Sequence, residues 1–328
     1  MNRPTTPTLS LPETLLANLK PSHFAVPLGI LALSACWVRL AGFADTAYPW
    51  AAQLSERLLD VGLLGLAVLL VLLLLKLILM PGRVWQEALH PGLGASFALV
   101  PVSCLLALTA LIAQYPQFKP LWHMIMLFAL ALQGLIAWRV VALLSTGQLH
   151  SESVSPVLYL PIVPGGFVGA MVLYQLALPG FAMLLFGMGL GGWALLEIRI
   201  LHRLFAGPLA PEVRPSIGLE IAPAAVGTLA ALHLWPQMSG ELIMIGIGVS
   251  SGPILAILTR WRWWSSLPFS IGFWSFSFPL AAVASAMVEA VRRAGWPIEV
   301  AYAVCLGISL VVLVLLINTA KMCFNSYK

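Results

Sequence analysis

The sequence predicts an all-α, polytopic membrane protein with ten transmembrane helices in five successive pairs. Hydrophobic residues make up 60% of its 328 residues and charged residues only 9%, whereas soluble domains carry roughly a quarter charged residues. The mean hydropathy is +0.96. Ten apolar runs recur along the chain without a polar stretch long enough for a separate soluble core. Every second run, beginning with the first, contains a proline, and this alternation defines the pairs.

Each apolar run is long enough for one membrane crossing, which takes about 20 residues of helix. A helix is required because every backbone polar group in lipid needs an internal partner. The predicted spans are 23–43, 58–80, 93–114, 120–144, 156–178, 179–204, 217–235, 240–260, 266–291 and 297–320. They form one transmembrane domain over residues 23–320. Residues 1–22 form an N-terminal tail and residues 321–328 a C-terminal tail.

The positions of the basic residues predict how the protein is inserted. With ten spans, both termini lie on the same side of the membrane. That side carries twelve of the Lys and Arg residues and the opposite side carries five. Cytoplasmic segments hold the excess of basic residues in membrane proteins, so we expect both tails in the cytoplasm.

The prolines of the odd-numbered runs predict which helices lie inside the bundle. A proline inside a helix removes one backbone hydrogen bond and bends the helix. In lipid this is tolerated only where protein or a water-filled cavity satisfies the freed carbonyl. We therefore expect five bent inner helices that line a pore and five straighter helices against lipid, although Pro253 in the eighth run departs from the pattern. The inner prolines are Pro27, Pro101, Pro161, Pro223 and Pro279.

Other classes of protein find little support in the sequence. The net charge is +5, but the basic residues are scattered singly, unlike those of a nucleic-acid-binding surface. The four cysteines lack the spacing of a metal or redox site. HExxH does not occur, and no histidine pair is spaced on one helix to hold a metal or haem. We therefore expect neither enzymatic activity, nor a cofactor, nor a bound metal.

Four segments carry a resemblance to a known family. They are HFAVPLGILALSACW in the first span, YLPIVPGGFVGA in the fifth, IGLEIAPAAVG in the seventh and FWSFSFPLAAVASAM in the ninth. These segments resemble the family of the bacterial tellurite-resistance protein TehA. That family also includes the slow-type anion channel of plant guard cells and the C4-dicarboxylate (malic acid) transporters. The resemblance extends from about residue 22 to 325, and the ninth-span motif is its most specific part.

The resemblance implies five helix hairpins with pseudo-fivefold symmetry around a central pore, assembled as a homotrimer in the bacterial inner membrane. It implies an anion channel whose pore is plugged by a phenylalanine of the ninth span. By its position in the W-x-F-x-F motif, the plug corresponds to Phe278. The sequence departs from the TehA pattern at Ala25 and at Pro279, where that pattern has glycine. Phe276 of the same motif and Ala25 are further candidate pore residues.

Two predictions for transport stay open. A channel would pass small monovalent anions through an apolar constriction that closes by dewetting, with selectivity from backbone dipoles because no Lys or Arg stands beside the five prolines. The alternative is a proton-coupled carrier that exports tellurite, sulfite or C4-dicarboxylates, with Glu220 as the coupling residue because a carboxylate within a span is costly. Two plain alternatives also stand, in which Glu220 is an interfacial carboxylate paired with Arg214 or another basic residue and Phe278 only packs between helices. A structural or receptor-like membrane protein is a third class.

Overall fold

The structure, a computed structural model, describes residues 11–43 and 49–325 of the chain. Within these ranges all regular structure is helical, which confirms the predicted all-α class. The parts of the predicted tails at 1–10 and 326–328 lie outside the described residues. The remainder of the predicted N-terminal tail contains a short helix, α1 (Leu11–Asn18).

Ten helical segments in the described part of the chain are long and apolar enough to cross a membrane, as predicted for a multi-pass membrane protein. Their α-helical parts are α2 (Ala25–Phe43), α3 (Pro49–Leu79), α5 (Leu99–Gln114), α6 (Lys119–Ser145), α7 (Tyr159–Gln175), α8 (Pro179–Phe205), α9 (Ala222–Leu234), α10 (Gly240–Thr259), α12 (Ser277–Ala294) and α13 (Ile298–Asn325). When the 3-10 segments that lead into these helices are counted, the largest boundary difference is in the second span, which begins at Pro49 and not at residue 58.

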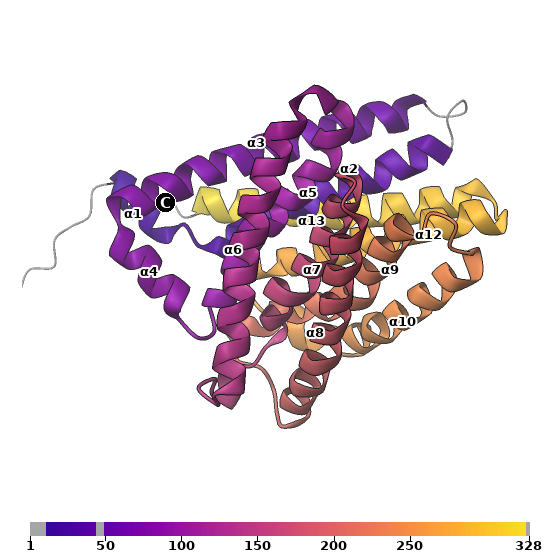
Figure 1. Cartoon of the computed structure of the whole chain (residues 1–328). Helices are drawn as coiled ribbons and strands as arrows, with labels where there is room; N and C mark the ends of the chain where they lie inside the picture. The colour runs from indigo at the N-terminus through magenta and orange to yellow at the C-terminus, as the bar shows by residue number, and fades with distance from the viewer. Residues whose placement is uncertain (1–10, 44–48, 326–328) are drawn as a thin grey trace, which may run out of the picture.

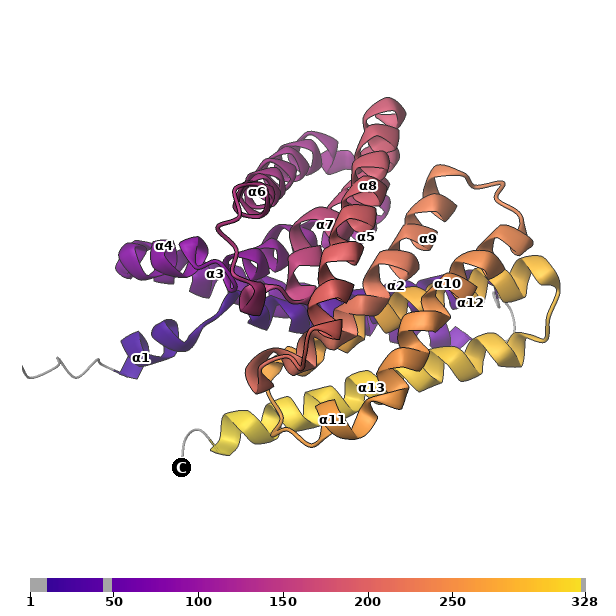
Figure 2. The same ribbon diagram turned by 90° about the horizontal axis from the view of Figure 1, so that it is seen from below.

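Burial alternates along the chain with the pairing of the spans. In the most apolar window of each odd-numbered span, 61% to 83% of the residues are buried, against 17% to 28% in each even-numbered span. Figures 1 and 2 show the second, fourth, sixth, eighth and tenth spans on the outside of the bundle. These spans are α3, α6, α8, α10 and α13. Their exposed faces carry large apolar side chains such as Leu64, Phe128 and Leu195, as a lipid-facing surface requires.

The helix contacts follow the same order. The first helix of each pair packs against the second helix of that pair, from α2 with α3 to α12 with α13. The first helices of the five pairs also contact one another in succession: α2 with α5, α5 with α7, α7 with α9 and α9 with α12. The last of them, α12, contacts α2 again. We call these five the inner helices. A conducting path between them remains a prediction.

The inner helices share one local feature, a short 3-10 helix that leads directly into the α-helix. These segments are η1 (Pro21–Phe24), η2 (Gly94–Ala98), η5 (Pro156–Leu158), η6 (Pro211–Ile221) and η7 (Ile271–Phe276). The predicted prolines lie at the second or third residue of the following α-helix. At these junctions the first N–H of the α-helix bonds back into the 3-10 segment, as that of Leu99 does to the carbonyl oxygen of Ser96, and proline cannot donate such a bond. The prolines therefore lie where the helix type changes, and the bend expected at each of them stays a prediction.

Both described chain ends lie at one end of the bundle (Figure 1). The short helix α4 (Pro81–Leu89) packs at that end against α3. Lys76 of α3 is fully buried there, 2.7 Å from Glu87 of α4 and 2.6 Å from the carbonyl oxygen of Leu19. We call the opposite end, which carries the α9–α10 and α12–α13 connections, the distal end. The remaining short helices are α11 (Trp261–Ser265), η3 (Pro116–Phe118) and η4 (Ser151–Ser153).

Candidate functional site

A small cavity lies between the inner helices, and all five of them contribute side chains to it. Its volume is about 60 Å³, enough for a few water molecules. Its lining is mainly apolar, with polar groups toward the distal end. The lining residues are Ala32, Ala35, Arg39, Leu106, Thr109, Met171, Val226, Leu229, His233, Phe278, Ala281, Ala282 and Ser285.

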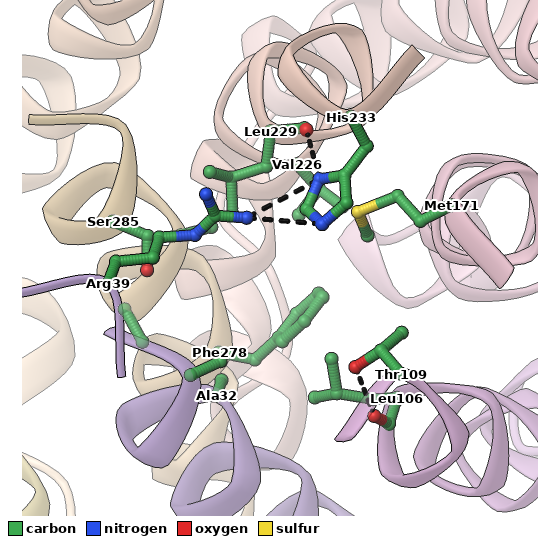
Figure 3. Close-up of a pocket in the computed structure, with 13 residues that line it drawn as sticks. Ala32, Arg39, Leu106, Thr109, Met171, Val226, Leu229, His233, Phe278 and Ser285 are labelled. Atoms are coloured by element: carbon green, nitrogen blue, oxygen red, sulfur yellow. Dashed lines mark hydrogen bonds between the residues drawn. The ribbon is translucent and has the colours of Figure 1, made fainter. Parts of the chain in front are cut away.

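Phe278 is the only Phe, Tyr or Trp among the cavity's lining residues, all of which the structure describes. It is the second residue of α12 and directly follows the η7 to α12 junction. Figure 3 shows its ring pointing between the helices, with Arg39 and His233 to one side and Leu106 and Thr109 to the other. The residue is 6% exposed. An apolar ring in so narrow a space excludes water from it.

Arg39 crosses the distal part of the cavity from α2 toward α9 (Figure 3). Its Nη2 atom lies 3.2 Å from Nε2 of His233. Nδ1 of His233 lies 2.9 Å from the carbonyl oxygen of Leu229, and because a carbonyl only accepts, Nδ1 must carry the hydrogen. Nε2 then has the lone pair and accepts from Arg39, so His233 is neutral in this arrangement and holds the guanidinium in place.

Glu289 of α12 gathers three guanidinium groups at the distal end. Its Oε1 atom lies 3.5 Å from Nη1 of Arg39, and its Oε2 atom lies 2.5 Å from Nη2 of Arg292 and 3.4 Å from Nε of Arg293. Arg293 also donates to the carbonyl oxygen of Met238. Three cations around one carboxylate leave an excess of two positive charges. Arg292 and Arg293 lie in the last turn of α12, where the partial negative charge of the helix C-terminus stabilises these positive charges.

The structure separates Phe278 from the other predicted site residues. Phe278 lines the cavity, whereas the five prolines and Ala25 are buried elsewhere in the inner helices. Phe276 also lies outside the cavity lining, and its ring packs against Trp264 with a centroid distance of 4.9 Å. Of the two phenylalanines in the W-x-F-x-F motif, Phe278 therefore lines the cavity and Phe276 packs against α11.

Glu220 lies near the other end of the bundle and does not line the cavity. Its Oε2 atom is 3.1 Å from Nη2 of Arg260 on α10, while its buried Oε1 atom has no hydrogen-bond partner in the described structure. The ion pair agrees with the interfacial interpretation, with Arg260 as the partner and not Arg214. The Arg214 guanidinium instead lies over the ring of Trp263 at 4.9 Å.

Sequence reasoning did not identify Arg39, His233 and Ser285 as site residues. One signal was present, because Arg39 is an ionisable residue inside an apolar span, and such residues usually mark a functional site. His233 carried no comparable signal. The site offers guanidinium, hydroxyl and apolar groups, a set that can bind and guide an anion. In the described residues no group of three or more His, Cys, Asp or Glu side chains is placed to hold a metal.

Comparison with known proteins assigns the family. The SLAC1 family, described as voltage-dependent anion channels, matches residues 18–323. The chain belongs to this family. One relative is the tellurite resistance protein TehA homolog of Haemophilus influenzae, 28% identical over 272 residues, which cover 81% of this chain and 80% of the relative. This match confirms the resemblance that the sequence motifs carry.

A plant member of the SLAC1 family shows the same similarity. The S-type anion channel SLAH2 of Arabidopsis thaliana is 26% identical over 281 residues, which cover 82% of this chain. The match covers 52% of the plant protein, so the chain spans about half the length of that relative.

Proposed function

We propose that this protein is an anion channel, in which small monovalent anions cross the membrane along the axis of the inner helices and Phe278 closes the path. The observation that carries this proposal is the ring of Phe278 in a cavity to which all five inner helices contribute. The positive excess around Arg39 supports anions over cations. The family description and the name of the plant relative support the same activity.

Closure by a phenylalanine is physically reasonable because it needs no covalent change and little energy. A hydrophobic constriction blocks ions by excluding water. Turning a side chain about 30° from its preferred rotamer costs only about 0.5–1.5 kcal/mol. Modest forces on α12 would therefore shift the balance between closed and open states.

Replacing the ring tests the proposal. In Phe278→Ala we expect anion conductance to rise on the order of tenfold or more, because the dewetted constriction becomes wide enough for water. The measurement is a planar-bilayer recording of purified protein across chloride, nitrate and malate gradients. Phe276→Ala is the matched control, since it removes a neighbouring buried ring outside the cavity. If the Phe278→Ala and parent proteins, at normal expression, have equal conductance, Phe278 is not the gate.

A proton-coupled carrier for tellurite, sulfite or C4-dicarboxylates is the second candidate function. It is favoured by one observation, the buried Oε1 atom of Glu220 without a partner, and the TehA homolog is named for tellurite resistance. A carrier requires saturating flux with proton uptake, which Glu220→Gln should abolish. A channel requires reversal potentials that follow the anion gradient at every pH.

The resemblance also leads us to propose a homotrimer in a bacterial inner membrane with both termini in the cytoplasm. The lipid-facing even-numbered spans support membrane insertion. The asymmetry of the basic residues supports the orientation.

A further inference from the structure

We propose that the distal part of the cavity is a binding site for one small monovalent anion, held by the guanidinium of Arg39 and the hydroxyl of Ser285. In the present structure Glu289 contacts Arg39 in the place of that anion. This inference rests on the proposed anion path and names the point at which an anion is bound along it.

The first support is the incomplete hydrogen bonding of Arg39. A guanidinium has five N–H donors in a planar fork. In the described structure Nη2 faces His233, Nη1 has only the long contact with Glu289, and Nε has no partner. The side chain is 21% exposed and lines the cavity. Donors of a fixed cation are therefore left for a ligand in this space.

The second support is the hydroxyl of Ser285, which points to a ligand independently of Arg39. Ser285 is 2% exposed and lines the cavity, and its hydroxyl has no hydrogen bond to any residue that the structure describes. Buried hydroxyls are normally paired, often with a carbonyl of the preceding turn. Thr109, on the same cavity, follows that rule with a 2.6 Å bond to the carbonyl oxygen of Leu106. Ser285 differs from Thr109 because its hydroxyl group has no such bond and can donate to a ligand in the cavity.

The third support is the uneven way in which Glu289 is held. Its contact with Arg39 is 3.5 Å, whereas its contact with Arg292 is 2.5 Å. An anion that displaced Glu289 from Arg39 would leave the carboxylate paired with the arginines of its own helix. The exchange would therefore leave neither a buried carboxylate nor a buried guanidinium without a counter-charge, the outcome that is costly in such sites.

Size and position limit the ligand to a small anion. A volume of about 60 Å³ suits chloride or nitrate with few waters, and the fork of Arg39 suits a planar oxyanion. Figure 3 shows Arg39 and Ser285 close together on one side of the Phe278 ring, and Ser285 comes seven residues after Phe278 in α12, toward the distal end. The bound anion would therefore lie against the closed gate.

Binding can be measured without any flux. We propose to replace gluconate by nitrate in steps at constant ionic strength and to measure the melting temperature of the purified full-length protein. A ligand that binds the folded state raises the melting temperature. Gluconate is too large for the cavity. The parent should show a saturable rise, and Arg39→Gln should abolish it. Arg39→Lys, which keeps the charge but loses the fork, should bind about tenfold more weakly, because charge-assisted hydrogen bonds are lost.

Glu289→Gln is the decisive variant, because the expected result is a gain. Removing the internal competitor should lower the half-saturating nitrate concentration about tenfold, and a misfolded variant cannot show this. The gain should vanish in the Arg39→Gln, Glu289→Gln double variant. Glu241→Gln is the control for general charge, since it removes an exposed carboxylate at the same end. A gain of equal size in Glu241→Gln, or a gain that survives without Arg39, would overturn the site.

Ser285→Ala tests the hydroxyl, with Ser250→Ala as the matched control. Ser250 is equally buried, but its hydroxyl is bonded to the carbonyl oxygen of Gly246 at 2.9 Å outside the cavity. We expect the half-saturating concentration to rise about threefold or more in Ser285→Ala, as the loss of one hydrogen bond implies, and to stay unchanged in Ser250→Ala. Equal values in both variants would remove Ser285 from the site.

The two proposals can fail separately. If Phe278→Ala conducts but Arg39→Gln keeps the nitrate titration of the parent, only the binding site is wrong. If Phe278→Ala does not conduct while nitrate still stabilises the parent through Arg39, only the gate is wrong.

Discussion

Gly29 of α2 shows how closely two inner helices approach. A Cβ atom built on this glycine would lie 2.1 Å from Oγ and 2.6 Å from Cβ of Ser277, the first residue of α12. No real carbon atom tolerates such contacts, so α2 and α12 can pack in this way only if residue 29 has no side chain. The contact is next to Phe278, and a shift of α12 here would move the Phe278 ring, the proposed gate.

We therefore expect Gly29→Ala to lower the free energy of unfolding by about 1–3 kcal/mol, the usual cost of overpacking. The measurement is the melting temperature in detergent. Gly42→Ala is the control in the same helix, because its Cβ atom would meet nothing within 4 Å. Ser277→Gly should restore part of the stability lost in Gly29→Ala. A stability of Gly29→Ala equal to that of Gly42→Ala would show that the helices are less tightly packed.

At the scale of the element, α7 has a proline inside its helix, and α6 compensates for it. Pro164 cannot donate to the carbonyl oxygen of Leu160, four residues earlier. The buried side chain of Gln133 on α6 donates to this oxygen at 3.1 Å and to that of Pro161 at 2.6 Å. Gly165 leaves the space for it, since a Cβ atom there would lie 2.1 Å from Nε2 of Gln133. An outer helix thus supplies the hydrogen bond that an inner helix lacks.

Gln133→Leu should therefore destabilise the protein by about 1–3 kcal/mol, because the carbonyl group of Leu160, which has no donor within α7, is left unpaired in an apolar surrounding. Pro164→Ala should restore part of this loss in the double variant, since the new N–H can bond the carbonyl of Leu160. A double-mutant cycle of melting temperatures measures the coupling. Gln114→Leu, at the exposed end of α5, is the control. Additive effects of Gln133→Leu and Pro164→Ala would contradict the compensation.

For the whole molecule, the sequence predicted what depends on local composition and missed what depends on distant contacts. Span number and the alternation of buried and exposed spans follow from apolar runs and prolines, so they were predictable. The start of α3 at Pro49 was missed, because its helix continues through the polar stretch 53–60, which hydropathy excludes. The prolines were predicted in the right helices, yet an apolar pattern does not distinguish a 3-10 helix from an α-helix.

The candidate site divides in the same way. The local W-x-F-x-F motif led to Phe278, which lines the cavity, and its role as a gate stays a proposal. The contact between Arg39 and His233 joins residues 194 positions apart, and that between Arg39 and Glu289 joins residues 250 apart. Neither pairing has a sequence pattern of its own, so only the closed succession of inner helices brings these groups to one cavity. The absence of basic residues beside the prolines led us to expect selectivity from backbone dipoles, whereas the structure places a guanidinium in the cavity.

The insertion of the whole molecule gives a final prediction. Cys323 is exposed near the end of α13, and the α9–α10 connection lies at the distal end (Figure 2). With the excess of basic residues on the side of the termini, Cys323 should react with a membrane-impermeant maleimide only in inside-out vesicles. Gln237→Cys, made in a Cys323→Ser background, should react only from outside intact spheroplasts. The buried Cys36 and Cys305 stay unlabelled in either case, and Cys104→Ala removes the remaining thiol. Labelling of Cys323 from outside would reverse the orientation, and the Arg39 site would then face the cytoplasm and meet anions leaving the cell.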